Sequence, residues 1–342
     1  MSRTPPRTLI VAPQWIGDAV MSQPLMAALA ARGEELTVAA LPWVAPVYRA
    51  MPEVHDVIEL PFAHGRLDLR ARWRLGRAWR GRFDSATVLP NSMKAALLPW
   101  FARIPVRVGY AGEGRLGLLN RRLPNPGGRP PMVATYGALS RAPFPADAAP
   151  LLWLPDGAID AAVHAARVER GRYWVFAPGA EYGPSKRWPA ERYAELARSR
   201  HAASGLPILL LGSPAEAALC EEVSAAAPGA CRVLAGTTAL GDAIALIAGA
   251  RGVVSNDSGL MHIAAAFRIP QVALFGSTSP EHTPPLSPRA RVIWLRGELP
   301  LDCIPCFERV CRYGHTLCLT SIEPARVETS LRDALEAGGS GE

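Results

Sequence analysis

One stretch decides the fold of this chain: Gly252-Val253-Val254-Ser255-Asn256-Asp257-Ser258-Gly259-Leu260-Met261-His262-Ile263-Ala264-Ala265-Ala266. Its apolar, β-branched start predicts a buried strand, and its alanine-rich end predicts a helix. Asp257 or Ser258 would be the N-cap, which leaves free backbone N–H groups at residues 258–260. A helix N-terminus with a glycine for close approach suits a phosphate or diphosphate. The stretch therefore predicts a strand–loop–helix unit with an anion site.

Two side chains extend this expected site. Asp257 repels phosphate, so we expect its carboxylate to hold hydroxyl groups, and His262 adds a polar group one turn into the helix. The alternative is an ordinary capped helix with a surface histidine.

Lysine usage points to a second loop. The chain has 37 lysines and arginines, but its only lysines are Lys94 and Lys186. Lys186 lies in the loop 178–189, after the strand-like residues 173–176 and before a helix that Pro189 opens. Lysine acts as a compact point charge on phosphate oxygens, where arginine's planar fork fits differently. This loop and the 257–260 loop could face one diphosphate, although two lysines can also survive by chance in an arginine-rich chain.

The bulk composition describes a globular protein of more than one domain. The chain has 342 residues, of which 49% are hydrophobic and 20% charged, with a net charge of +7. This length favours two domains. No apolar run approaches the ~20 residues of a membrane helix, and the N-terminus leads directly into a strand without a signal peptide. We therefore predict a cytoplasmic protein with an anionic partner.

Strands alternate with helices in both halves of the chain, which predicts an α/β protein with two doubly wound parallel sheets. The expected domains are residues 1–165 and 166–325, followed by a helix and tail at 326–342 that could cross back to the first domain. Ligands are expected at the carboxyl ends of the strands, in a cleft between the domains. The expected strands are 8–12, 36–40, 57–60, 85–89, 173–176, 207–211, 232–234, 252–254 and 271–275; the expected helices lie near 19–31, 44–50, 66–82, 92, 189–203, 214–226, 240–250 and 324–337.

The expected helix at residues 66–82 is strongly basic. It has seven arginines and one acid, with leucine and tryptophan between them. Such a helix suits nucleic acid, an anionic membrane surface or an acidic acceptor, or it is a solvated face. Because no nucleic-acid motif accompanies it, we favour a membrane surface or acidic glycolipid and predict no nucleic-acid partner. The arginines are Arg66, Arg70, Arg72, Arg74, Arg77, Arg80 and Arg82.

Acids also follow strands. Asp18 follows the first strand in Gly17-Asp18-Ala19, where its carboxylate could accept a proton from a substrate hydroxyl, or simply start a helix favourably. Glu216 follows the strand at 207–211 and could hold ribose hydroxyls. The loop around Thr238 offers a small mixed pocket for a base.

Four of the six cysteines fall close together, at Cys303, Cys306, Cys311 and Cys318, with His315 among them. One C-x-x-C followed by two further thiols can form a tetrahedral zinc site, although the spacing is not that of two zinc knuckles. Three interpretations of this cluster remain open: a structural metal site, a redox cluster, or reduced cysteines that pack in the core.

Together these motifs resemble a known family. The resemblance is to the lipopolysaccharide heptosyltransferases of glycosyltransferase family 9, type II in particular, and runs from residue 8 to about 335. It implies the GT-B fold, with two facing Rossmann-like domains, and an inverting glycosyltransferase that moves L-glycero-D-manno-heptose from ADP-heptose to the first heptose of the lipopolysaccharide core. The matching segments are Gln14–Gln23, Leu89–Lys94, Pro178–Glu181, Lys186–Pro189, Asn256–His262 and Phe275–Ser287.

The resemblance also implies roles for residues. Asp18 becomes the catalytic base in an acceptor-binding first domain, and Lys186 supports the leaving diphosphate. The expected donor-binding residues are Glu181, Ser185, Lys186, Glu216, Thr238, Asp257, Ser258, Gly259 and His262. The expected acceptor-binding residues are Asn91, Lys94, Arg66, Arg72 and Arg107. No metal or other cofactor is expected, and the enzyme would work at the inner leaflet of the inner membrane on heptosyl-Kdo2-lipid A.

Two other functions remain open from the sequence. One is a sibling heptosyltransferase with a different core acceptor. The other is a non-catalytic two-domain ligand-binding protein, which the missing export signal and the carboxylate of Asp18 disfavour.

Overall fold

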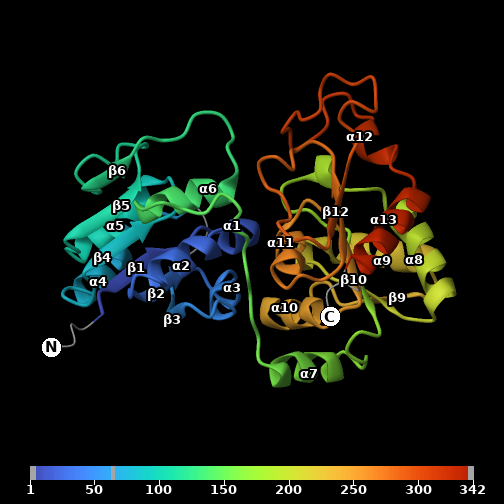
Figure 1. The fold of residues 1–342 in the computed structure, drawn as a ribbon, viewed down its shortest axis with the longest axis horizontal. Helices are drawn as coiled ribbons and strands as arrows, with labels where there is room; N and C mark the ends of the chain where they lie inside the picture. The colour runs from blue at the N-terminus through green and yellow to red at the C-terminus, as the bar shows by residue number, and fades with distance from the viewer. Residues whose placement is uncertain (1–4, 63–65, 338–342) are drawn as a thin grey trace. The chain divides into compact units, whose positions relative to one another are not determined.

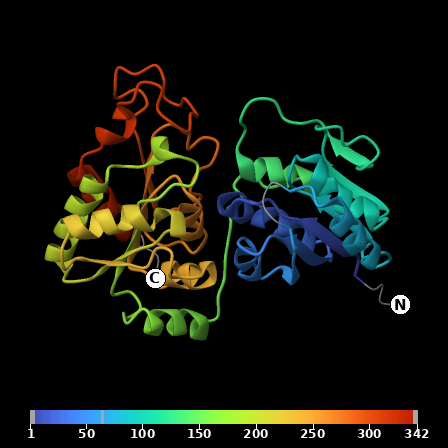
Figure 2. The same cartoon turned by 180° about the vertical axis from the view of Figure 1, so that it is seen from behind.

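The computed structural model of the chain describes residues 5–62 and 66–337 and divides the chain into two compact units. The first unit is Met1–Trp153 and the second is Leu154–Glu342. Each unit contains one six-stranded, all-parallel sheet with helices around it (Figure 1; seen from behind in Figure 2). The predicted α/β class is therefore confirmed.

The first sheet has the order β3-β2-β1-β4-β5-β6. Its strands are β1 (Arg7–Val11), β2 (Glu35–Ala40), β3 (Val54–Glu59), β4 (Ser85–Val88), β5 (Val106–Tyr110) and β6 (Arg121–Leu123). The helices are α1 (Ile16–Met21), α2 (Gln23–Ala30), α3 (Ala45–Arg49), α4 (Leu69–Ala78), α5 (Met93–Phe101) and α6 (Met132–Gly137). The structure has two helices where a single helix was expected near 19–31. The chain turns at Ser22, and Pro24 lies in the first turn of the second helix, α2.

Alternating side chains of the central strands build the core of this unit. Leu9 and Val11 of β1 pack with Val88 of β4 in one cluster, which Trp79 and Leu98 from the α4 and α5 side complete. Because successive strand residues face opposite sides, Ile10 points to the other face of the sheet. The sheet is thus buried on both faces, as parallel sheets are.

The second sheet has the order β12-β11-β10-β7-β8-β9. Its strands are β7 (Trp174–Ala177), β8 (Ile208–Leu210), β9 (Cys231–Val233), β10 (Gly252–Asn256), β11 (Gln271–Phe275) and β12 (Ala290–Trp294). The helices are α7 (Asp156–Ala165), α8 (Ala190–Ser204), α9 (Ala217–Ala226), α10 (Leu240–Ala248), α11 (Gly259–Ala266), α12 (Leu317–Thr320) and α13 (Pro324–Glu336).

Both sheets have the same topology. In each, the first and fourth strands along the unit lie side by side at the centre, and the chain proceeds outward in opposite directions from them. This is the Rossmann strand order, and its reversal point leaves a crevice at the carboxyl ends of the two central strands. The crevice lies after β1 and β4 in the first unit, and after β7 and β10 in the second.

Two boundaries differ from the expected ones. The units divide before α7 rather than after it, because Ile159 and Val163 of α7 pack near Gly249, at the end of α10. The C-terminal helix α13 belongs to the second unit rather than to a separate segment. It packs within the second unit, where Val327 and Leu331 join the core.

Within residues 5–62 and 66–337, no helix is both long and apolar enough to cross a membrane.

Candidate active site

The first unit has a cavity of about 460 Å³ at the carboxyl ends of its strands. Residues from the ends of β1, β2, β3, β4 and β5 line it, which is where the strand order predicts a ligand. Asp18 lies in this lining, in the first turn of α1. Several of the predicted acceptor residues also line it, namely Asn91, Lys94 and Arg72.

Tyr136 of α6 contacts Asp18 in this cavity. Its phenol shares a hydrogen bond with the Asp18 carboxylate, and it is only 5% exposed. Burial, together with the negative charge of Asp18, raises the pKa of Tyr136 well above its usual value. The phenol therefore stays protonated and donates to the carboxylate. The sequence analysis missed Tyr136, because nothing in its local sequence marks it.

Arg72 is a buried cation beside the cavity. Its guanidinium lies 4.0 Å from the ring centre of Phe62 and donates to the Leu67 and Lys94 carbonyls at 2.7 and 3.3 Å. Burial lowers its pKa. The residue thus joins α4 to the first turn of α5, which carries Lys94, and adds positive charge to the cavity lining.

The loop after β4 is held by an arginine that the sequence analysis did not single out. Arg115 is 1% exposed and donates to the Pro90 carbonyl at 2.9 Å and to Asn91 Oδ1 at 3.1 Å. This fixes the Asn91 side chain at the rim of the cavity.

Two predicted acceptor residues lie outside the cavity lining. Arg107 donates to the carbonyls of Leu118 and Ile104, so its guanidinium holds together the loops around β5. Arg66 is exposed and ion-pairs with Asp68 at 3.4 Å. The structure gives neither residue a place in this cavity.

In the second unit, Lys186 and Asp257 meet. Lys186 Nζ lies 2.6 Å from Asp257 Oδ2, and both side chains are largely buried, at 13% and 5% exposed. The same carboxylate oxygen accepts a hydrogen bond from Thr278 Oγ1 at 2.6 Å. The loops after β7 and β10 are thus brought together as predicted, but Lys186 is ion-paired rather than an isolated cation.

The helix after β10 starts as the sequence predicts. Ser258 is the N-cap of α11, and Asp257 turns its side chain toward Lys186 instead of capping the helix. Ser258 Oγ is buried, and no described residue hydrogen-bonds to it. An orphaned buried hydroxyl costs free energy unless a ligand satisfies it. It therefore marks the N-terminus of α11 as a place for a polar ligand.

His262 lies one turn into α11 and is buried rather than on the surface. Burial lowers its pKa to about 4; nearby Asp257 opposes that shift and Lys186 adds to it. The imidazole is therefore neutral near pH 7.

The loop 178–189, which carries Lys186 and is named the lysine loop, is anchored by Asn256, the last residue of β10. Asn256 Oδ1 accepts the Trp188 N–H at 3.1 Å, and its Nδ2 donates to the Pro178 carbonyl at 2.7 Å. One side chain thus ties both ends of the lysine loop to the central strand. Ser185, a predicted donor residue, is buried and bonds to Ser277 at 3.1 Å.

Glu216 lies where the ribose acid is expected, after β8. Its Oε2 accepts the Ser213 N–H at 2.7 Å, completing a capping box. A Cβ added at Gly179 would fall 2.1 Å from Glu216 Oε1, so this glycine lets the lysine loop approach the carboxylate. Thr238 bonds to the Leu234 carbonyl at 3.0 Å, and Glu181 is exposed.

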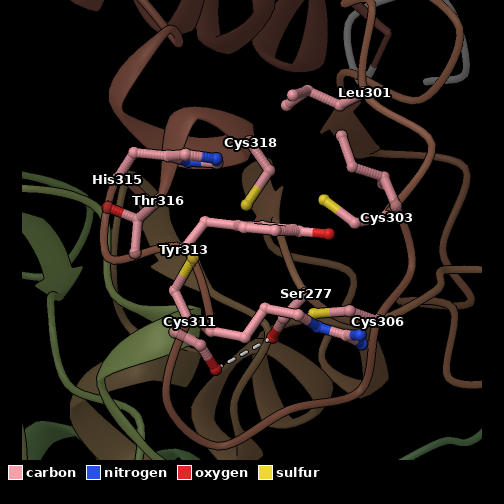
Figure 3. Close-up of a pocket in the computed structure, with 13 residues that line it drawn as sticks. Ser277, Leu301, Cys303, Cys306, Cys311, Tyr313, His315, Thr316 and Cys318 are labelled. Atoms are coloured by element: carbon pink, nitrogen blue, oxygen red, sulfur yellow. Dashed lines mark hydrogen bonds between the residues drawn. The ribbon is translucent and has the colours of Figure 1, made fainter.

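The four clustered cysteines line one small cavity of about 20 Å³ in the second unit (Figure 3). All four are free thiols. In the part of the chain that the structure describes, no three His, Cys, Asp or Glu side chains are placed to hold a metal ion.

Comparison with known proteins now identifies the family. The model of glycosyltransferase family 9 (heptosyltransferase) matches residues 72–317. The chain belongs to glycosyltransferase family 9. It is 40% identical to lipopolysaccharide heptosyltransferase 2 of Salmonella typhimurium, over 97% of this chain and 99% of that protein. It is 42% identical to lipooligosaccharide heptosyltransferase 2 of Haemophilus influenzae, over 85% of this chain and 89% of that protein.

Solved structures agree with this assignment. The structure of E. coli ADP-heptose lps heptosyltransferase II superposes with a TM-score of 0.85 at 37% identity, covering 98% of this chain and 100% of that one. A family 9 protein from Veillonella parvula has the same fold, with a TM-score of 0.82 at 18% identity. This family 9 glycosyltransferase therefore has the GT-B fold of two Rossmann-like domains.

The two groups of residues supply different chemistry for a glycosyltransferase. In the first unit, a carboxylate beside a phenol can accept a proton from a hydroxyl. In the second, a lysine and a helix N-terminus can stabilise a leaving diphosphate.

Proposed function

We propose that this glycosyltransferase transfers L-glycero-D-manno-heptose from ADP-heptose to the first heptose of the lipopolysaccharide inner core, on heptosyl-Kdo2-lipid A. The observation that carries the proposal is the Lys186–Asp257 pair beside the α11 N-terminus, in a chain 40% identical to a heptosyltransferase 2 over nearly its whole length. The Asp18 cavity of the first unit supplies the complementary base.

The proposed reaction is an inverting displacement in which Asp18 acts as the general base. Asp18 takes the proton from a hydroxyl of the acceptor heptose, and the oxygen attacks the anomeric carbon of the donor. The bond from that carbon to the phosphate oxygen breaks as the new glycosidic bond forms, and ADP leaves with the electron pair. Tyr136 holds the carboxylate in place through its hydrogen bond.

The donor is held by the second unit in this proposal. Lys186 and the backbone N–H groups at Ser258 and Gly259 balance the charge of the diphosphate, so the chemical step needs no metal cofactor. The orphaned Ser258 hydroxyl gains a partner when the donor binds. Asp257 and His262 face the heptose. Glu216 accepts hydrogen bonds from the ribose hydroxyls, and Thr238 lies near the adenine base.

The acceptor is held by the first unit. Arg72 and Lys94 line the cavity with Asp18, and their positive charge suits an acceptor that carries acidic sugars. Asn91, fixed by Arg115, offers a polar contact to sugar hydroxyls.

We also propose that the enzyme works at the inner leaflet of the inner membrane through α4. The arginines of α4 other than Arg72 are exposed, and Leu69 and Trp73 lie among them at 49% and 43% exposed. Exposed apolar groups among cations suit the interface of an anionic membrane.

The decisive experiment compares acceptors with the purified enzyme and ADP-heptose. We expect ADP release with heptosyl-Kdo2-lipid A and only background release with Kdo2-lipid A. Release with Kdo2-lipid A alone would instead make the protein a sibling enzyme that adds the first heptose. ADP-heptose binding without transfer to any core acceptor would favour a ligand-binding protein.

A further inference from the structure

The cysteine segment is the one motif that the proposed reaction does not use. It runs from Cys303 to Cys318, and apart from the start of α12 it contains no helix or strand. It nonetheless folds so that all four thiols line one cavity of about 20 Å³, roughly the space of a single small ion or water. In Figure 3 the sulfurs of Cys303, Cys306, Cys311 and Cys318 all point into the same space.

The cavity offers four sulfur ligands to a bound ion. Besides the four thiols, its lining has the imidazole of His315 and the guanidinium of Arg312 but no carboxylate. Its hydroxyl groups are those of Ser185, Ser277, Tyr313 and Thr316. Thiolates select thiophilic ions such as Zn²⁺ or Fe²⁺ over Mg²⁺ or Ca²⁺. The thiols are not paired as disulfides in this structure, so all four are available.

The turn after Cys311 is built around its sulfur. The backbone N–H groups of Thr316, Tyr313, Gly314 and His315 donate to the Cys311 thiol. Gly314 has a φ of +73°, a left-handed conformation that glycine adopts without strain and that lets the chain curl around the sulfur. These contacts fix the position of the Cys311 sulfur at the cavity.

We propose that Cys303, Cys306, Cys311 and Cys318 bind one thiophilic divalent cation, Zn²⁺ or Fe²⁺, as a structural site of this domain. The sulfurs must draw together to do so, because no three of them stand at metal-binding geometry among the described residues. Zn–S bonds of about 2.3 Å require such a closed arrangement. The irregular backbone from 303 to 316 permits this closure without breaking a helix or strand.

The site would also support the lysine loop. Ser185 donates its backbone N–H to the Arg309 carbonyl at 3.2 Å and its hydroxyl to the Glu308 carbonyl, and Tyr182 bonds to the Phe307 carbonyl. A Cβ at Gly183 would fall 2.4 Å from the Arg309 carbonyl oxygen, so the two segments are in close contact. The metal-bound segment therefore holds the residues next to Lys186. This consequence for ADP rests on the proposed donor site.

The test starts with metal content, which does not depend on activity. Full-length enzyme is purified under reducing conditions and its metals are counted by mass spectrometry; after removal of metal, Co²⁺ is titrated and its visible spectrum recorded. We expect close to one Zn²⁺ or Fe²⁺ per chain, and a tetrahedral thiolate spectrum with Co²⁺. Cys306→Ser and Cys311→Ser should each lose most of the metal. Cys231→Ser, a partly buried cysteine outside the cluster, is the matched control and should keep it.

The outcomes separate the two proposals. Absence of bound metal in the parent, no Co²⁺ spectrum, or retention of full metal by both cluster variants would overturn the site. If metal is bound, its removal should weaken ADP binding at least several-fold by calorimetry, with recovery on adding Zn²⁺. Metal binding with unchanged ADP affinity would keep the site but refute its support of the lysine loop. A failure of ADP to bind even the metal-loaded enzyme would instead count against the proposed donor site.

Discussion

Asp257 serves two partners with one oxygen. Its Oδ2 accepts from both Lys186 and Thr278, so the ammonium is held near the α11 N-terminus by a fixed counter-charge. The ion pair compensates the cost of burying the ammonium, which an unpaired charge at this depth would pay in full. A diphosphate that approaches Lys186 would share the ammonium with Asp257 rather than find it free. The sequence analysis placed both residues at one site but did not predict this ion pair, because a sequence does not show which side chain turns toward which.

We expect Lys186→Ala to weaken ADP binding about 10- to 100-fold, the range for losing a charge-assisted hydrogen bond. The change also leaves Asp257 as a buried, unpaired carboxylate. Lys186→Arg should recover only part of the affinity, since the planar guanidinium differs in shape and hydration. Calorimetry with ADP measures both.

Lys94→Ala is the matched control, because it removes the other lysine, in the first unit, and should leave ADP affinity unchanged. Full affinity in the arginine variant would contradict the argument that a compact ammonium is needed.

Asp18→Asn should lower turnover by on the order of 10²–10⁴-fold while leaving ADP affinity intact, because a general base acts in the chemical step and not in donor binding. Steady-state ADP release and calorimetry separate the two effects. Near-normal turnover would reduce Asp18 to a residue that favours the start of α1 through the helix dipole.

Tyr136 acts through Asp18, so its effect should appear in the pH profile. Tyr136→Phe removes the donated hydrogen bond. We expect lower kcat and an acidic limb of the rate profile moved to higher pH, because the ionised carboxylate loses a stabilising partner. Tyr110→Phe is the control, since its hydroxyl donates to the Thr135 carbonyl instead. An unchanged pH profile in Tyr136→Phe would show that the phenol only fills space.

His262 makes stability depend on pH. Its pKa is about 4 when folded and ordinarily 6.5, so between these values the unfolded chain binds a proton that the native protein does not. Stability therefore falls as pH drops from 6.5 toward 4, by up to about 3 kcal/mol from this group. His262→Gln should lose less stability over that range, which thermal unfolding at pH 7 and pH 5 would show. Equal losses in both proteins would mean that His262 does not titrate as described.

At the scale of elements, periodicity predicted the strands from β1 to β4 and from β7 to β11, including the edge strands β3 and β9. Strands β5, β6 and β12 and helices α6, α7 and α12 were not predicted. Strand β6 has only three residues, Arg121–Leu123, whose polar side chains carry no hydrophobic signal. Strand β5 mixes Arg107 and Gly109 with valines, and β12 follows a proline-rich loop, so neither reads as an apolar run. Buried central strands are recognisable because both of their faces are covered; edge strands lack that constraint.

Helix α4 tests the proposed membrane contact. The arginines to change are Arg70, Arg74 and Arg77, which are exposed, rather than Arg72, which is buried and bonded to backbone. Their replacement by glutamine should remove about 1 kcal/mol each of attraction to an anionic surface. We therefore expect about a hundredfold weaker binding to anionic liposomes at low salt and a higher KM for lipid-embedded acceptor.

The control for α4 replaces three exposed arginines of the second unit, Arg170, Arg172 and Arg332, and so makes the same change in net charge. Equal liposome binding by the two triple variants would show that only total charge matters. Parent-like binding by the α4 variant would make this helix a solvated face.

At the scale of the whole molecule, the topology could be predicted from the sequence, but the roles of individual residues could not. The same strand order occurs in both units, and each places its chemical groups after its two central strands. Motifs after strands therefore located Asp18, Lys186 and Asp257 correctly in the fold. They did not separate Arg72, which lines a cavity, from Arg107, which braces a loop, because that depends on packing between distant segments.

The charge balance of the complete reaction leads to one further expectation. In the proposed reaction, Lys186 and the backbone N–H groups of α11 stabilise the leaving diphosphate, so transfer should proceed at the same rate without added Mg²⁺ and with brief EDTA treatment. Initial rates of ADP release measure this. A strict requirement for Mg²⁺ in the transfer step would show that these groups do not suffice.

The arginine bias of the chain has a practical consequence. Its two lysines lie one in each unit, Lys94 at the cavity that contains Asp18 and Lys186 beside Asp257. Apart from the chain terminus, every primary amine of this protein therefore belongs to one of the two candidate substrate sites. Modification of these amines by an amine-directed reagent thus reports on the occupancy of both sites at once, each read from a single peptide, and requires no engineered reporter residue.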